Sequence, residues 1–223
     1  RVSGTPSVLA LPGASEELRV TLTQGLAAVN ALLEKRIDHA DPFIAQASGH
    51  LAAAGGKRFR PLLTILASEL GSGVNDQVVA AATGVELTHL ASLYHDDVMD
   101  EAPMRRGAQS ANARWTNSIA ILSGDFLFAR ASRLVSTLGP DAVRIIAETF
   151  AELVTGQMRE TVGATGDIDP IDHYLKVVWE KTGSLIAAAA RFGSMAAGAD
   201  PDSIERTQVG KAKRVLDERP KQN

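Results

Sequence analysis

Apolar residues recur every three or four positions over long stretches of this chain, and this spacing restricts the fold more than any other feature. One stretch runs from Asp76 to Met99, with apolar residues at Val78, Val79, Ala82, Val85, Leu90 and Leu93. A second runs from Asp141 to Met158. Such a repeat places an apolar face along a long α-helix. Because the faces are wide and rich in alanine, we expect long helices packed closely in a bundle.

Glycine, proline and aspartate separate these segments, at positions 71–73, 139–141, 163–170 and 199–202. No set of alternating β-branched runs lies between turns, so strands are not expected. The 223 residues are enough for one domain with a substantial core. The sequence therefore predicts an all-α single domain over residues 16–206, after a flexible leader at 1–15 and before a C-terminal tail at 207–223.

Composition excludes several classes of protein. The net charge of −3 argues against a general nucleic-acid binder. The chain has no cysteine, which excludes disulfides and thiolate metal sites. It contains no run of about eighteen apolar residues, so no membrane span is predicted, and Pro12 and Gly13 interrupt the apolar patch near the N-terminus. We expect a cytoplasmic protein.

The stretch HLASLYHDDVMDEAPMRRG, from His89 to Gly107, carries an acidic cluster directly before a basic one. On a helix turning by about 100° per residue, His89, Asp96 and Asp100 fall within about 40° of one another. Asp97 lies about a quarter turn away. Two carboxylates four residues apart repel each other and raise one another's pKa. Mg²⁺ relieves this repulsion, because it binds one or two carboxylates together with phosphate oxygens.

The acidic cluster has two other interpretations. It could be a solvated acidic helix end. The pair His95-Asp96 also occurs in metal-dependent phosphohydrolases, but those enzymes need further histidines on other helices, and the sequence contains no second His-Asp pair.

Basic residues flank the acidic cluster on both sides. Met104–Gly107 is expected to form a loop after Pro103. Upstream, AAAGGKRFRPLL combines two glycines with Lys57, Arg58 and Arg60. Glycine lets a backbone approach a ligand closely, and Arg and Lys bind phosphate. The segment does not match a P-loop. An alternative interpretation is a solvated helix start. Metal-binding aspartates beside a second anion site suit a transfer reaction in which diphosphate leaves.

In order, the motifs GGKRFRP, ELTHLASLYHDDVMD, MRRG, GDFLFA, TGQMRET and EKTGSL resemble the all-trans polyprenyl diphosphate synthases, from about Gly55 to about Arg206. Among these, the chain looks most like actinobacterial long-chain synthases that make a menaquinone side chain. The resemblance implies an isoprenoid synthase bundle around a central cavity, and a homodimer. It also implies Mg²⁺-dependent condensation of isopentenyl diphosphate with an allylic diphosphate such as farnesyl or geranylgeranyl diphosphate. A peripheral membrane contact for product release is a further implication.

The resemblance also assigns residues. The diphosphate of isopentenyl diphosphate would be bound by Lys57, Arg60, His89 and Arg106. Mg²⁺ bridged to the allylic diphosphate would be held by Asp96 and Asp100, with Asp97 in support. The same diphosphate would be bound from the other side by Arg105, Lys181 and Thr182. Gln157 would lie near the reacting carbons or the metal. The implied catalytic residues are therefore Asp96, Asp100, Gln157 and Lys181.

In this family, bulky residues four and five positions before the first aspartate block the tunnel for the growing chain. Here those positions are Ser92 and Ala91, and both residues are small. Ser92 lies one helical turn below Asp96 on roughly the same face. We therefore predict a product longer than fifteen carbons.

The sequence departs from the family in one respect. The family has a second aspartate-rich motif, but after Asp172 the only aspartates here are unpaired, at Asp200, Asp202 and Asp217. The pattern also changes abruptly near Arg206-Thr207. We expect that a segment is omitted between two joined pieces; the alternative is a shortened, non-catalytic subunit of a heteromeric synthase. A terpene cyclase shares the metal chemistry but has no use for the second diphosphate pocket.

Overall fold

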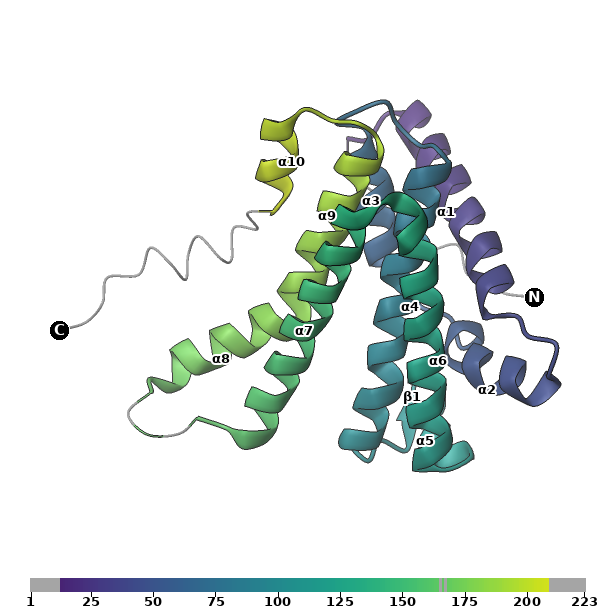
Figure 1. Ribbon diagram of the computed structural model, residues 1–223, viewed down its shortest axis with the longest axis vertical. Helices are drawn as coiled ribbons and strands as arrows, with labels where there is room; N and C mark the ends of the chain where they lie inside the picture. Colours follow the sequence, from purple (N-terminus) through teal and green to yellow (C-terminus); the bar gives the residue numbers. More distant parts are fainter. Residues whose placement is uncertain (1–12, 165, 167, 209–223) are drawn as a thin grey trace.

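The computed structural model describes residues 13–164, 166 and 168–208, and they are almost entirely helical (Figure 1). In chain order the elements are α1 (Glu16–Ile37), α2 (Pro42–Ala53), α3 (Phe59–Ser68), α4 (Asp76–Met99), β1 (Met104–Arg105), β2 (Ala108–Gln109), α5 (Ala111–Arg114), α6 (Asn117–Val135), η2 (Ser136–Leu138), α7 (Pro140–Val162), α8 (Pro170–Val178), η3 (Trp179–Gly183), α9 (Ser184–Ala196) and α10 (Pro201–Gln208). The predicted all-α fold is confirmed.

Local sequence signals explain where the long helices begin and end. Asn75 caps α4, and its side chain accepts a hydrogen bond from the Val78 amide at 2.9 Å. Ser15 caps α1 in the same way through the Leu18 amide. Proline at the first helical position opens α7, and Gly163 in a left-handed conformation ends it. The predicted helix from Asp76 to Met99 has the observed bounds of α4.

Helix α4 is the centre of the bundle. It packs against α6, α3, α9 and α1, and its buried residues face in all directions. Tyr94 shows how tightly α2 is fastened to it: the buried phenol donates to the Ala47 carbonyl at 2.6 Å and accepts from the Leu51 amide at 3.2 Å. Because α4 is held on all sides, its C-terminal turns have a fixed position.

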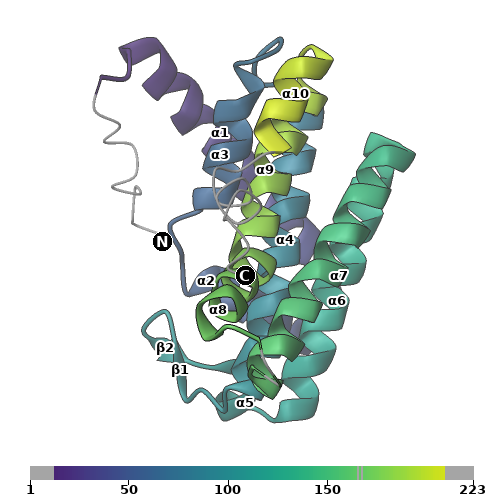
Figure 2. The same cartoon turned by 90° about the vertical axis from the view of Figure 1, so that its left-hand side faces the viewer.

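One difference from the sequence analysis lies directly after α4. The stretch Met104–Gly107, predicted to be a loop, begins an antiparallel hairpin in which Met104 pairs with Gln109 and Arg105 with Ala108. Arg106 and Gly107 form its turn, both with positive φ. Two-residue strands are too short to leave an alternating pattern in the sequence. Figures 1 and 2 both place this hairpin at the end of the molecule where α4 and α7 finish.

Helices α1 to α10 span Glu16–Gln208, whereas residues 1–12 of the predicted leader and 209–223 of the predicted tail lie outside the described residues. Of the helices in the described ranges, none is both long and apolar enough to cross a bilayer.

Candidate functional site

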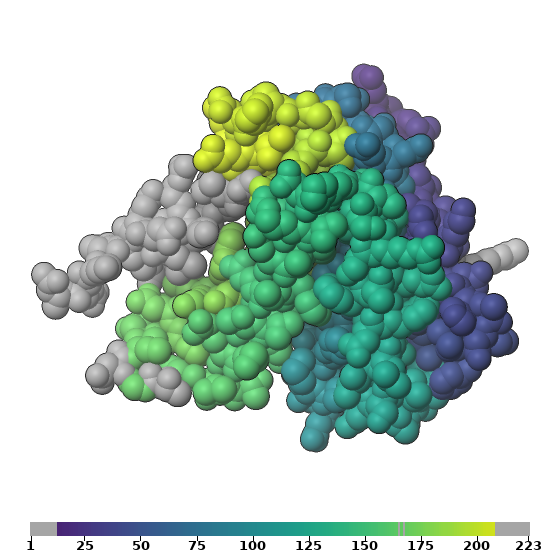
Figure 3. All heavy atoms as spheres, in the orientation of Figure 1, coloured from purple at the N-terminus to yellow at the C-terminus, as the bar shows by residue number. Residues whose placement is uncertain are grey.

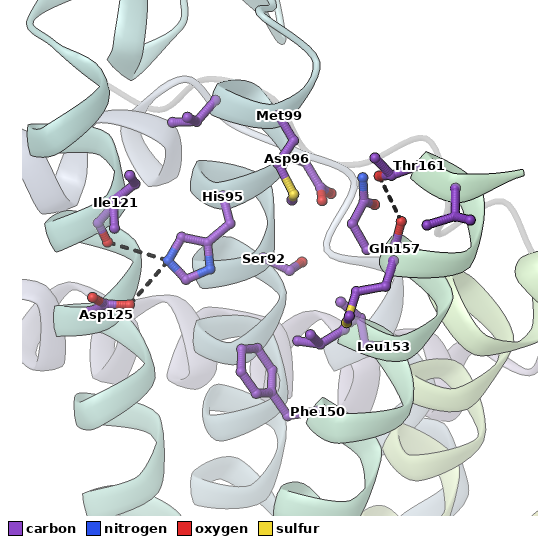
Figure 4. Close-up of a pocket in the computed structure, with 14 residues that line it drawn as sticks. Ser92, His95, Asp96, Met99, Ile121, Asp125, Phe150, Leu153, Gln157 and Thr161 are labelled. Carbon is purple, nitrogen blue, oxygen red and sulfur yellow. Dashed lines mark hydrogen bonds and ion pairs between the residues drawn. The ribbon is translucent and has the colours of Figure 1, made fainter.

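A cavity of about 610 Å³ lies between α4, α6 and α7. In the space-filling view the molecule is hollowed there, between the green of α7 and the teal of α4 and α6 (Figure 3). Most of its wall is apolar, and the polar groups include Ser92 and Asp96 from α4 and Gln157 and Thr161 from α7. Figure 4 shows Asp96 and Gln157 facing each other from the two helices. An apolar cavity with a few convergent polar groups is the usual form of a small-molecule site.

The last turn of α4 carries Asp96, Asp97 and Asp100, which together form the acidic region. Asp96 faces the cavity. Burial raises its pKa and so does the neighbouring Asp100 carboxylate, while Lys181 and Arg105 oppose the rise. Asp100 is 52% exposed. Because the pKa of Asp96 remains raised, the nearby cations offset its burial and the repulsion only in part.

Asp97 points the other way, as its place a quarter turn from the pair predicts. It is fully buried, and its Oδ1 accepts a hydrogen bond from Arg105 Nε at 2.5 Å. Its Oδ2 has no hydrogen-bond partner among the described residues. Arg105 also approaches Asp100, with Nη2 and Oδ2 at 3.8 Å. Asp97 therefore holds Arg105 beside Asp100.

The donor groups of the acidic region suit a divalent metal ion. In the described ranges no group of three or more His, Cys, Asp and Glu side chains converges tightly enough to chelate a metal without other ligands. Two repelling carboxylates one helical turn apart are instead what Mg²⁺ takes when water and phosphate oxygens complete its shell. Asp96 and Asp100 would supply those carboxylates.

The basic region lies two to three turns earlier on α4 and is arranged around Glu86. This carboxylate is 2% exposed and accepts a hydrogen bond from Arg58 Nη1 at 2.8 Å. Arg58, Arg60 and Arg106 are all close enough to lower its pKa, which burial raises. Three partly buried guanidinium groups thus lie near one buried carboxylate, which leaves an excess of positive charge around it.

Arg58 is fully engaged in structure. Besides Glu86, it donates to Asn30 Oδ1 and to the Ala52 carbonyl, both at 3.2 Å. Its backbone is in the left-handed region, with φ of 49°. Arg58 therefore fixes the loop that carries Lys57, which is exposed and has no polar partner within the described part of the chain.

Arg106 joins the hairpin to the same loop. Its Nη1 donates to the Leu51 carbonyl at 3.1 Å and to the Gly55 carbonyl. At Gly56 a Cβ atom would lie 2.8 Å from the Arg106 guanidinium, and φ there is 141°. Only glycine allows this approach. Arg60 stands nearby with a buried Nε that has no partner in the described ranges.

His89 completes the basic region, one turn after Glu86. Burial and the positive charges of Arg60, Arg106 and Arg58 lower its pKa to about 2. His89 is therefore neutral at physiological pH, and it can serve an anion as a hydrogen-bond donor rather than as a cation.

Lys181 reaches the acidic region from the opposite wall. It lies in η3, a π-helical turn, and pairs there with Glu160 of α7. Gly156 of α7 makes this position accessible, because a Cβ atom on it would lie 2.9 Å from the Lys181 backbone nitrogen and 2.6 Å from Glu180 Cβ. Thr182, the next residue, is exposed. A single π-helical turn is a frequent feature of functional sites.

Gln157 and the two predicted chain-length residues occupy different environments. Gln157 is buried in the cavity wall, and its Oε1 has no hydrogen-bond partner among the described residues. Ser92 also lines the cavity. Ala91 is not part of that wall; it packs in the core, where its carbonyl would lie 3.1 Å from a Cβ atom on Gly124 of α6.

The structure brings the predicted charged site residues into two regions, and it adds Glu86 and Arg58 to the basic one. The sequence does carry a signal for Glu86: a single carboxylate three residues before His89 in an otherwise apolar stretch. No pattern in the sequence indicated that Arg58 differs in role from Lys57 and Arg60.

Several known proteins that are similar to this chain are named as polyprenyl diphosphate synthases or their components. The sequence profile of the polyprenyl synthetase family matches residues 41–212. A nonaprenyl diphosphate synthase of Mycobacterium tuberculosis is 54% identical over 200 residues, covering 87% of this chain and 60% of that protein. Component 2 of a heptaprenyl diphosphate synthase of Geobacillus stearothermophilus is 37% identical, covering 83% and 58%.

The fold is shared as well. A crystal structure of geranylgeranyl pyrophosphate synthase from Corynebacterium glutamicum, complexed with calcium and isoprenyl diphosphate, has a TM-score of 0.80 and 52% identity, covering 87% of this chain and 60% of that one. The chain thus spans about 60% of the length of these relatives. The resemblance predicted from the motifs is confirmed.

Proposed function

This chain belongs to the polyprenyl synthetase family, and we propose that it is a prenyltransferase that condenses isopentenyl diphosphate with an allylic diphosphate, releasing diphosphate. The product is an all-trans polyprenyl diphosphate of medium or long chain. One observation supports the proposal most strongly: the buried Glu86, which lies near three partly buried arginines, is on the same helix as the repelling carboxylates Asp96 and Asp100. Two diphosphates can therefore bind side by side by different means.

The basic region would bind isopentenyl diphosphate. The single negative charge of Glu86 does not neutralise the positive charges of the arginines near it, which include Arg60 and Arg106. A diphosphate would neutralise the remaining charge. Lys57, exposed and without a partner among the described residues, can turn onto the same anion. Neutral His89 would donate a hydrogen bond to the same diphosphate.

The acidic region would receive the allylic diphosphate. Asp96 and Asp100 would hold Mg²⁺, which supplies the positive charge that stabilises a departing diphosphate. Arg105, held by Asp97, and Lys181 lie on the two sides of this position and would orient the diphosphate, with Thr182 beside it. Gln157 faces Asp96 across the cavity and would position the reacting end of the substrate. The apolar walls would take the hydrocarbon chain and exclude water.

The wider assignments follow from the family. We infer a homodimer in the cytoplasm, a product used as a menaquinone side chain, and a peripheral membrane contact that releases it. A second candidate function is a non-catalytic subunit of a heteromeric synthase. It is favoured by the lack of a second pair of aspartates in the sequence, and one relative is itself named as a component.

A prenyl-transfer assay tests the proposal. Purified protein is incubated with labelled isopentenyl diphosphate, an allylic starter and Mg²⁺, and product length is read by chromatography. We expect products several five-carbon units longer than the starter, and no transfer in EDTA. No transfer with farnesyl or geranylgeranyl diphosphate as starter would reject the enzyme and favour the subunit.

A further inference from the structure

The hairpin β1–β2 carries one arginine for each of the two proposed diphosphate sites. Arg105 is held by Asp97 in the acidic region, whereas Arg106 belongs to the basic region. In the folded chain both side chains bind the protein itself, since Arg106 Nη1 donates to the Leu51 and Gly55 carbonyls. A guanidinium that turns onto a diphosphate gives up some of these contacts. The hairpin then needs an attachment that involves neither arginine.

His50, in the last turn of α2, makes such an attachment. Its Nε2 lies 2.6 Å from the carbonyl oxygen of Gln109 in β2. Gln109 pairs with Met104, the neighbour of Arg105 in β1. A carbonyl oxygen can only accept a hydrogen bond, so Nε2 carries a proton and is the donor. The hairpin backbone is therefore fastened to α2 without the use of Arg105 or Arg106.

Arg114 of α5 holds the ring of His50 in this orientation. Its Nη1 lies 3.2 Å from Nδ1 of His50, and a guanidinium nitrogen can only donate. Nδ1 is therefore the acceptor, which matches the tautomer with the proton on Nε2. Trp115 packs edge-on against the imidazole, with ring centroids 5.2 Å apart, and the Arg114 guanidinium lies over the indole. Figure 1 shows α2, β1 and α5 at the same end of the molecule. These contacts together fix the ring of His50 against the hairpin.

A second histidine offers a comparison within the same chain. His39 lies in the turn before α2, and its Nδ1 accepts from the Asp41 amide at 3.0 Å. Its ring packs edge-on against Phe126 of α6, with centroids 5.8 Å apart. These partners belong neither to the hairpin nor to the cavity wall. Replacing His39 thus removes a hydrogen bond and a ring contact without touching the hairpin.

We propose that His50, oriented by Arg114, is a positioning residue that holds the hairpin in place for both diphosphates. The inference rests on the proposed prenyltransferase function and adds a residue outside the two binding regions. The hairpin carries Arg105 for the allylic diphosphate and Arg106 for isopentenyl diphosphate, so the loss of His50 should weaken the binding of both. Loss of the carboxylates of the acidic region should instead affect the allylic substrate alone.

The first test compares His50→Ala, His50→Asn and His50→Gln by calorimetry with each substrate alone in Mg²⁺. The amide of glutamine can reach the position of Nε2 and donate to Gln109, whereas asparagine is one methylene shorter. Both affinities should fall by about tenfold in the alanine and asparagine variants, and by less than about threefold in the glutamine variant. His39→Ala is the matched control and should leave both affinities unchanged. Equal affinities in the asparagine and glutamine variants would overturn the proposal, and so would a loss confined to one substrate.

Hydrogen exchange tests the attachment without any ligand. Deuterium uptake is followed by mass spectrometry in peptides that cover residues 103–110. Uptake by this segment should be faster in His50→Ala and His50→Asn than in the wild type or His50→Gln, because the hairpin opens more often. His39→Ala should not change it. Unchanged uptake in His50→Ala, or in His50→Asn if the alanine variant fails to fold, would overturn the proposal. If the wild type bound neither diphosphate, the proposed function would fail, and hydrogen exchange would still decide whether His50 holds the hairpin.

Discussion

The basic and acidic regions lie within a few turns of each other on α4, and the protein treats their charges differently. In the basic region a buried carboxylate, Glu86, is surrounded by Arg58, Arg60 and Arg106, and hydrogen bonds fix Arg58 and Arg106 to the backbone. In the acidic region Asp96 and Asp100 repel each other, and the nearest arginine is held mainly by Asp97. Under the proposed function, one anion site would be formed by the folded chain alone, whereas the other would be completed by a cation from solution.

This difference shows how two chemically identical groups can be told apart. Both substrates proposed for this chain carry a diphosphate, but in the proposed reaction only the allylic substrate loses it. Direct contacts to arginine and lysine hold a diphosphate without activating it. A site that requires a metal can place extra positive charge where negative charge develops during the reaction.

Neutralising both carboxylates of the acidic region should abolish transfer. In Asp96→Asn/Asp100→Asn we expect activity to fall by about 10³-fold or more, which corresponds to ~4 kcal/mol of transition-state stabilisation. The affinity for isopentenyl diphosphate should stay close to that of the wild type, because its site is separate. The control is Asp141→Asn, because Asp141 is exposed and lies in the first turn of α7, outside the acidic region. An equal loss of affinity for both substrates would mean that the regions are not independent.

Removing the charge of Glu86 should lower the free energy of unfolding, because it leaves the arginines of the basic region unpaired. Glu86→Gln leaves three buried or half-buried arginines without their counter-charge, and breaking such a pair costs about 3–5 kcal/mol. Urea denaturation would measure the loss. The double variant Glu86→Gln/Arg58→Gln should recover part of it, since the strongest unpaired charge is gone. Stability unchanged in the single variant would show that Glu86 does not organise this region.

Substitutions at Ser92 and Ala91 should have different effects, because Ser92 lines the cavity and Ala91 packs in the core. Ser92→Phe projects into the cavity and should shorten the product without weakening either diphosphate. Ala91→Phe enters the contact with α6 and should cost about 1–3 kcal/mol of stability through overpacking. Product analysis and thermal melting distinguish the two effects. If Ser92→Phe shortened the product and also weakened the binding of isopentenyl diphosphate, the cavity and the basic region would not be independent.

The pH dependence of stability should carry a small contribution from His89. Its pKa is about 2 in the folded protein, below the 6.5 of an ordinary histidine. The unfolded chain therefore takes up a proton as pH falls through 6.5 and the folded chain does not. The stabilising effect is complete above about pH 6.5 and declines as pH falls toward the folded value. The difference in urea midpoint between about pH 7 and about pH 5 should be smaller in His89→Gln than in the wild type, and equal differences would contradict a neutral His89.

The sequence predicted the framework of this site better than its fine arrangement. The spacing of apolar residues predicts α4 to the residue, and the projection separates Asp97 from Asp96 and Asp100 because helix geometry is regular. The pairing of Asp97 with Arg105 depends instead on a two-residue hairpin, and such short strands leave no periodic signal. The approach of Lys181 depends on a π-helical turn packed on Gly156, and the roles of Arg58 and Glu86 depend on contacts between residues far apart in the chain. Tertiary packing, which one sequence does not display, decides these features.

Calorimetric titration with each substrate alone, in Mg²⁺ and in EDTA, tests most directly whether the two diphosphates bind at separate sites and only one of them depends on the metal. Neither substrate can condense by itself, so binding is measured without reaction. We expect isopentenyl diphosphate to bind with an affinity that changes by less than about threefold when Mg²⁺ is removed, because the basic region supplies its own charge. The affinity for the allylic diphosphate should fall at least about 100-fold, because Asp96 and Asp100 then repel it. Equal dependence of both affinities on Mg²⁺, or no dependence of either, would contradict two separate diphosphate sites.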